Sequence, residues 1–145
     1  MRATDLHAIW AAPDNSRLTS RQSSFRLPVH VAAKLNALCE LYPNKSKTQI
    51  VGDLLATAID ASLEALPSAK GRVIDVVEDD NGGQVELAAD IGPWARFRKL
   101  ANQHYADLER ELGNDSPQLL YPYEYTAEKP DERVEAFIYS ERRRS

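Results

Sequence analysis

The chain has 145 residues, of which 43% are hydrophobic and 28% charged, and its net charge is −4. This length suits one domain or one small domain with an appendage, and the composition is that of a globular protein with a core. No apolar run approaches the roughly 20 residues that span a bilayer, and the single cysteine excludes an internal disulfide, so we expect a cytoplasmic protein without a membrane partner.

The charge is distributed unevenly along the chain. Residues 1–50 hold seven basic and three acidic residues, a net charge of +4, whereas the remainder holds eleven basic and nineteen acidic residues, a net charge of −8. Such asymmetry is typical of a basic binding face joined to an acidic appendage. A nucleic-acid partner is therefore compatible with an acidic protein overall.

Residues 1–21 are expected to form a short helix followed by a connector. Thr4 suits the first position of a helix that runs to Trp10 or Ala12, and the residues from Pro13 to Ser16 end it. The residues from Arg17 to Arg21 are polar and basic.

Residues 22–27 alternate in the manner of a half-buried strand. Phe25 and Leu27 share one face, and Gln22, Ser24 and Arg26 share the other.

Two amphipathic helices are predicted next, and they complete a domain of residues 22–66. Pro28 opens the first helix, which runs to about Leu41, and Ser46 with Gln49 forms a capping box that opens the second, which runs to about Leu66. Their apolar stripes have helical spacing. With Phe25 and Leu27, the predicted dimer core consists of Val31, Leu35, Leu38, Ile50 and Leu54.

Residues 67–113 are predicted to form a β-hairpin and a long helix. Strand-like segments at 72–78 and 84–90 flank an Asn81-Gly82 turn, and a helix follows over 93–112. We expect His104 at the core or its boundary. The predicted apolar face of this helix consists of Trp94, Phe97, Leu100, Ala101, Leu108 and Leu112.

The tail, residues 114–145, is rich in proline and tyrosine and is expected to be mostly irregular, with short extended pieces. It docks on the protein's own surface, binds a protein partner through residues 115–145, or is disordered. The residue pattern leaves these alternatives open.

The predicted strand 22–27 needs a partner, because its backbone N–H and C=O groups cannot stay unpaired. No second strand is predicted nearby, so we expect the same strand from a second copy, paired as a two-fold antiparallel ribbon. A two-stranded ribbon fits the major groove of DNA, where Arg can bind guanine and Gln can bind adenine. The start of the second helix suits a phosphate.

Residues 22–66 resemble the ribbon-helix-helix DNA-binding domain of the Arc/MetJ/CopG type. The resemblance is carried by the run from Ser24 to Pro28, the stripe Val31/Leu35/Leu38, and Ser46-Lys47-Thr48 followed by Ile50, Leu54 and Leu55. It implies a mainly α fold with short β segments (α+β), a homodimer or a pair of dimers, and double-stranded DNA as partner. It further implies that Gln22, Ser24 and Arg26 read bases and that Lys45, Ser46, Lys47 and Thr48 contact phosphates.

The sequence thus predicts a bacterial-type transcriptional regulator, a repressor in the leading hypothesis. The alternatives are the antitoxin of a toxin–antitoxin pair, which the tail suggests, and a dimeric protein-interaction module without DNA, which the overall acidity suggests. No catalytic motif, metal-spaced cluster or cofactor loop is recognised, so neither an enzyme nor a cofactor is expected.

Overall fold

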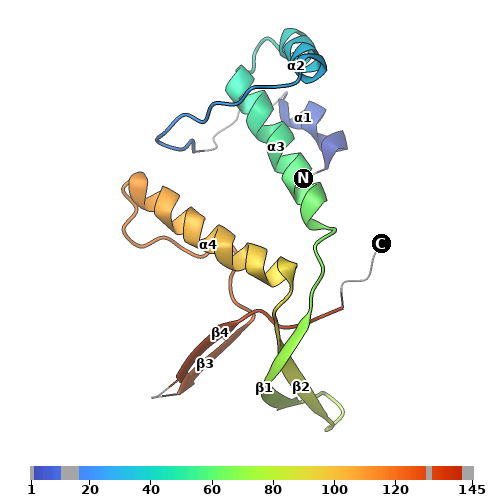
Figure 1. Cartoon of the computed structure of the whole chain (residues 1–145), viewed down its shortest axis with the longest axis vertical. Coiled ribbons are helices and arrows are strands. Elements are labelled where there is room, and N and C mark those ends of the chain that lie inside the picture. The colour runs from blue at the N-terminus through green and yellow to red at the C-terminus, as the bar shows by residue number, and fades with distance from the viewer. Residues whose placement is uncertain (1, 11–16, 130–131, 142–145) are drawn as a thin grey trace. The chain divides into compact units, whose positions relative to one another are not determined.

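The computed structural model describes residues 2–10, 17–129 and 132–141 (Figure 1). The chain is a mixture of helices and two small antiparallel sheets, as the predicted α+β class requires. It divides into two compact units, residues 1–65 (unit 1) and residues 66–145 (unit 2). Within the described ranges, no helix has the length and apolar character needed to cross a membrane.

Unit 1 is helical. A short 3₁₀ turn, η1 (Ala3–Asp5), leads into α1 (Leu6–Trp10), and two longer helices follow, α2 (Val29–Leu41) and α3 (Lys47–Leu63). The two long helices confirm the prediction to within three residues at each end. The predicted end of the first helix, at residues 13–16, lies outside the described residues.

The core of unit 1 joins the N-terminal segment to the two long helices. Leu6, Trp10, Leu35 and Ile50 are its buried residues, and Ile50 is fully inaccessible to solvent. The indole Nε1 of Trp10 donates a hydrogen bond to Asp53 Oδ2 at 2.7 Å, which satisfies the one polar atom of this side chain. The N-terminal segment is therefore part of the core rather than an appendage to it.

Unit 2 contains two pairs of antiparallel strands, and the second pair consists of short extended pieces in the tail. β1 (Lys70–Glu78) pairs with β2 (Gln84–Asp90), and Gly82 at their turn has a φ of 78°, as the Asn81-Gly82 signal predicts. β3 (Tyr125–Lys129) pairs with β4 (Glu132–Ala136) within the tail. A bridge from Ala89 to Ile138 then joins the tail to β2.

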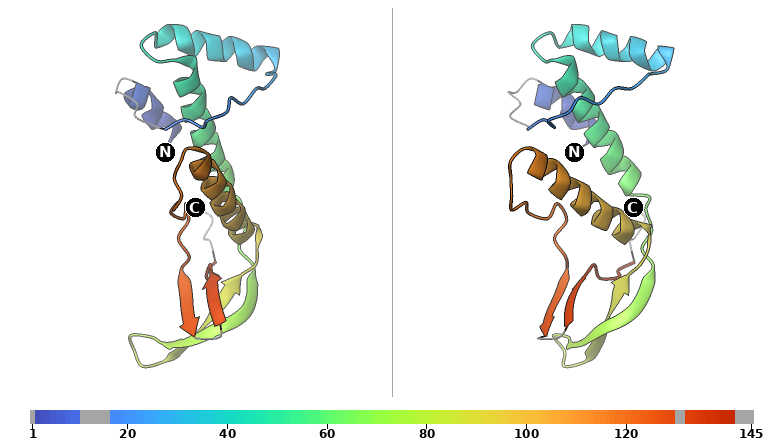
Figure 2. Two further views of the ribbon diagram at one scale, coloured as in Figure 1. Left: turned by 90° about the vertical axis from the view of Figure 1, so that its left-hand side faces the viewer. Right: turned by 60° about the vertical axis from the view of Figure 1, so that its left-hand side comes forward.

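The long helix α4 (Pro93–Glu111) lies at one end of both hairpins, and the segment after it runs back along the helix (Figures 1 and 2). The apolar face that the sequence suggested is covered only in part: Trp94 and Phe97 are half-buried and pack against Tyr121, whereas the three leucines of that face are exposed. The buried side chains of α4 include the polar residues Arg98, Asn102 and Glu109, which we call the tail seam.

Each member of the tail seam binds a residue of the returning segment. Asn102 exchanges two hydrogen bonds with the backbone of Tyr121, at 2.8 and 3.0 Å, and Glu109 accepts one from Asn114 at 3.0 Å. Paired in this way, polar side chains can be buried without the cost of unsatisfied groups. Leu100, Leu108 and Leu112 remain exposed as a result, and so does His104, which we expected in or near the core.

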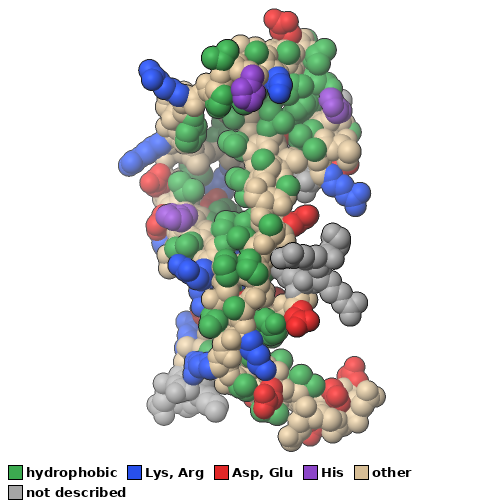
Figure 3. All heavy atoms as spheres, turned by 45° about the vertical axis from the view of Figure 1, so that its right-hand side comes forward, with side chains coloured by type: hydrophobic (Ala, Val, Ile, Leu, Met, Phe, Trp, Pro, Cys, Tyr) green, Lys and Arg blue, Asp and Glu red, His purple; other side chains and the backbone are tan. Residues whose placement is uncertain are grey.

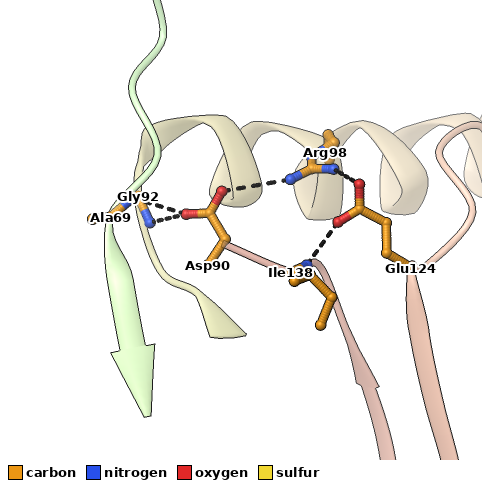
Figure 4. A network of polar contacts seen from close by, with 6 residues as sticks. All are labelled: Ala69, Asp90, Gly92, Arg98, Glu124 and Ile138. Carbon is orange, nitrogen blue, oxygen red and sulfur yellow. Dashed lines mark hydrogen bonds and ion pairs between the residues drawn. The ribbon is translucent and has the colours of Figure 1, made fainter. Parts of the chain in front are cut away.

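A buried carboxylate, Asp90, connects the parts of unit 2 (Figure 4). Its Oδ1 accepts hydrogen bonds from the backbone N–H of Ala69 at 3.0 Å and of Gly92 at 2.9 Å. Its Oδ2 lies 3.6 Å from the guanidinium of Arg98, which in turn lies 3.5 Å from Glu124. The Asp90 side chain thereby links the start of the unit, the start of α4 and, through Arg98, the tail.

Burial by itself raises the pKa of Asp90, but the hydrogen bonds from Ala69, Gly92 and Ser68 and the positive charge of Arg98 outweigh it. The net effect lowers the pKa below its ordinary value of 3.8. Asp90 is therefore charged throughout the neutral range, and the interaction is retained until the medium becomes strongly acidic.

We predict that Asp90→Asn destabilises unit 2 by about 3 kcal/mol at pH 7, because it leaves the buried Arg98 without one of its two carboxylates. The pKa in the folded state is lowered, so the stabilisation is present above about pH 4 and is lost as the pH falls through the folded value. Thermal unfolding followed by circular dichroism between pH 2 and 7 should show the difference between wild type and variant shrinking in acid. A difference that is independent of pH would contradict the prediction.

Candidate nucleic-acid interface

The segment before α2 is the predicted base-reading strand, and in the single chain it is irregular. Within the described residues, positions 22–27 make no backbone hydrogen bond and belong to neither a strand nor a helix. Phe25 is 76% exposed and Leu27 47% exposed in the single chain, and their prediction as part of a dimer core stays a prediction. The apolar face of this segment is therefore uncovered in one copy of the chain.

The three predicted base-reading residues, Gln22, Ser24 and Arg26, are exposed. The pairing of two such segments into a ribbon requires a second copy of the chain, and it stays a prediction. Val31 of the predicted dimer core is also exposed, whereas Leu35 and Ile50 are buried and Leu38 and Leu54 pack against them.

The second group of predicted contacts lies at the start of α3, where the capping box is confirmed. Ser46 Oγ accepts a hydrogen bond from Gln49 N at 3.2 Å, and Gln49 Oε1 accepts one from Ser46 N at 3.1 Å. Lys47 and Thr48 follow in the exposed first turn. No acidic residue lies in this turn, so the positive end of the helix dipole faces solvent without a carboxylate beside it.

Lys47 also links the start of α3 to α2, because its Nζ donates a hydrogen bond to Asn36 Oδ1 at 3.2 Å. This contact holds one positive charge beside the first turn of α3. The predicted phosphate-contacting residues Lys45, Ser46, Lys47 and Thr48 are thus adjacent on one helix end, as their sequence order requires.

Unit 1 exposes further apolar side chains on its helices. Leu55 and Ile59 of α3 are about half exposed, and Val29 opens α2 with most of its surface in solvent. Figure 3 shows hydrophobic side chains, in green, open to the surface around these helices. Exposed apolar clusters of this kind are typical of interfaces.

The contribution of Leu6 and Trp10 to unit 1 was not predicted. Their spacing of four residues on a short helix was visible, but nothing in the sequence indicated which helices they would contact. In the described part of the chain, no group of three or more His, Cys, Asp or Glu residues is arranged to hold a metal ion.

Comparisons with protein-family models, with curated proteins and with solved structures gave no match for this chain.

We predict that Ser46→Ala lowers the stability of unit 1 by about 1 kcal/mol, because it leaves an N–H group at the start of α3 without its acceptor. Ser62→Ala is the matched control, since Ser62 lies in the same helix and its hydroxyl donates only to the Ala58 carbonyl within α3. Urea unfolding followed by Trp10 fluorescence in a Trp94→Phe background measures both. Equal losses for the two variants would show that the cap contributes nothing specific.

Proposed function

We propose that the chain is a dimeric DNA-binding protein whose residues 22–27 pair with the same residues of a second copy. The observation that carries this proposal is the segment itself, which has an exposed apolar face and unpaired backbone groups beside a packed helical core. Pairing with a second copy would satisfy the backbone and cover Phe25 and Leu27 at once. An antiparallel ribbon with two-fold symmetry is the simplest such arrangement.

In this arrangement the polar face of the ribbon enters the major groove. Arg26 donates to guanine, Gln22 binds adenine, and Ser24 serves either base. The start of α3, with the exposed Lys47 and the half-buried Lys45 just before the helix, contacts the phosphates and positions the ribbon. The net charge of +4 over residues 1–50 supports this division, because DNA attracts a basic surface even in an acidic protein.

The biological role that fits such a protein is sequence-specific regulation of transcription, by repression, in the cytoplasm of a bacterial-type cell. Two-fold symmetry implies a palindromic site, bound by a dimer or a pair of dimers.

The antitoxin alternative loses the observation that motivated it. That hypothesis needed a flexible C-terminal segment that folds on a partner, whereas β3, the Tyr121–Asn102 hydrogen bonds and the Ala89–Ile138 bridge hold the tail within unit 2. The protein-interaction module without DNA remains as the outcome to expect if no DNA is bound.

We predict that Arg26→Ala weakens binding to the preferred site by about tenfold, the equivalent of one base contact, while the dependence on salt hardly changes. Lys47→Ala should weaken binding to all sequences and reduce the salt slope by about one. Selection from random duplexes supplies the site, and titrations at several salt concentrations supply the slopes. Arg72→Ala, an exposed arginine of unit 2, is the control. Wild-type protein that selects no sequence would overturn the proposal.

We also predict that alternate amides of residues 22–27 are protected from hydrogen exchange at high protein concentration, because a two-stranded ribbon hydrogen-bonds every second residue of each strand. Phe25→Asp should abolish this protection by placing a charge under the ribbon, and Val73→Asp, at an exposed position in β1, should leave it unchanged. Exchange measured by mass spectrometry at two concentrations tests both variants. Fast exchange of these amides at every concentration would mean that no ribbon forms.

A further inference from the structure

The helix α4 and its C-cap residue Leu112 carry a second partly exposed apolar surface, centred about a third of a turn or more from the tail seam. Leu100, Leu108 and Leu112 are 51%, 42% and 37% exposed, and His104 between them is also exposed. We call these four residues the α4 stripe. They succeed one another at intervals of four, so they follow one side of the helix.

None of the stripe residues is among the buried residues of α4 in the described part of the chain. The helix is held to the rest of the unit by Arg98, Asn102 and Glu109, which lie more than a quarter turn away from His104 around the helix. Leucines at three of four successive turns remain partly in solvent, although burying each would be favourable. An exposed row of this length on a fixed helix is the signature of a contact surface.

We propose that the α4 stripe is an interface with a second copy of this chain, in which two α4 helices pack antiparallel about a two-fold axis at His104. The spacing supports self-pairing, because Leu100 and Leu108 lie four residues to either side of His104. In an antiparallel pair centred there, Leu100 of one copy faces Leu108 of the other, and the contact repeats by symmetry.

The charges beside the stripe are complementary under the same symmetry. Arg96 and Lys99 lie in the first half of α4, and Asp107 and Glu111 lie in the second half. With a rise of about 1.5 Å per residue, the antiparallel pair brings Arg96 level with Glu111 of the second copy, whereas Lys99 lies about 140° around the helix from His104 and takes no part in the contact. Parallel packing would instead place like charges together, so the pattern favours the antiparallel pair.

Arg110 is the one basic residue in the acidic half. Its guanidinium lies 3.5 Å from Asp107 of its own helix, and it is on the side of α4 away from the stripe. It therefore does not oppose the pairing directly.

The closing test uses the full-length chain with Cys39→Ala and one new cysteine. At a crossing of two helices about 9 Å apart, Cα atoms on the axis facing each other come within roughly 4–5 Å, which a disulfide can bridge. We expect His104→Cys to form a disulfide-linked dimer under mild oxidation. Gln103→Cys is the matched control, because its position points sideways and leaves its Cα atoms roughly 10 Å apart, beyond the reach of a disulfide.

A reciprocal charge exchange supplies a second readout. Arg96→Glu should reduce the cross-linked fraction of the His104→Cys protein several-fold, and Arg96→Glu with Glu111→Arg should restore it. No cross-link through residue 104, equal cross-linking through 103 and 104, or no restoration by the double exchange would overturn the proposal. If residue 104 forms no cross-link, the stripe is covered by another part of the chain or by a different protein.

This inference is independent of the DNA-binding proposal. The α4 stripe belongs to unit 2, whereas the ribbon and the basic residues belong to unit 1. If residue 104 forms no cross-link but the protein still binds DNA selectively, only the proposed α4 contact is contradicted. If residue 104 forms the cross-link but no DNA is bound, only the proposed function is contradicted.

Discussion

A backbone segment with one apolar side needs both a hydrogen-bonding partner and a cover, and this requirement governs the first unit of the protein. Residues 22–27 find neither among the described residues of a single copy. The helices behind them are already well formed, with Ile50 fully buried and a complete capping box at Ser46. The unit is thus stable in its core and incomplete at one side, which is the condition for assembly through that side.

Elements defined by local signals were predictable from the sequence. The capping box at Ser46, the Asn81-Gly82 turn and the end of the helix predicted over 93–112 all lie where the pattern indicated. Each of these depends on one or two residues whose preferred conformations are known.

Contacts between segments that are distant in the chain could not be predicted from the sequence. Three of the buried residues of α4 are polar, because the returning tail supplies partners for Arg98, Asn102 and Glu109, and hydrophobic spacing therefore identified only part of the covered face. The same contacts order a tail that composition alone marked as irregular. The burial of Asp90 could not be predicted either, because a buried aspartate is recognised only from the N–H groups and the guanidinium around it.

The position of Asp90 in unit 2 also bears on how the chain can be divided. Its side chain accepts the N–H of Ala69, and its own backbone N–H donates to the carbonyl of Phe137 at 2.8 Å, so both extremities of the unit meet at one residue. A chain cut after residue 69 or before residue 137 would expose a buried charge and an unpaired strand edge. Unit 2 can therefore be separated as a whole at the Leu66 boundary. It cannot be shortened past Ala69 at its start or past Phe137 at its end.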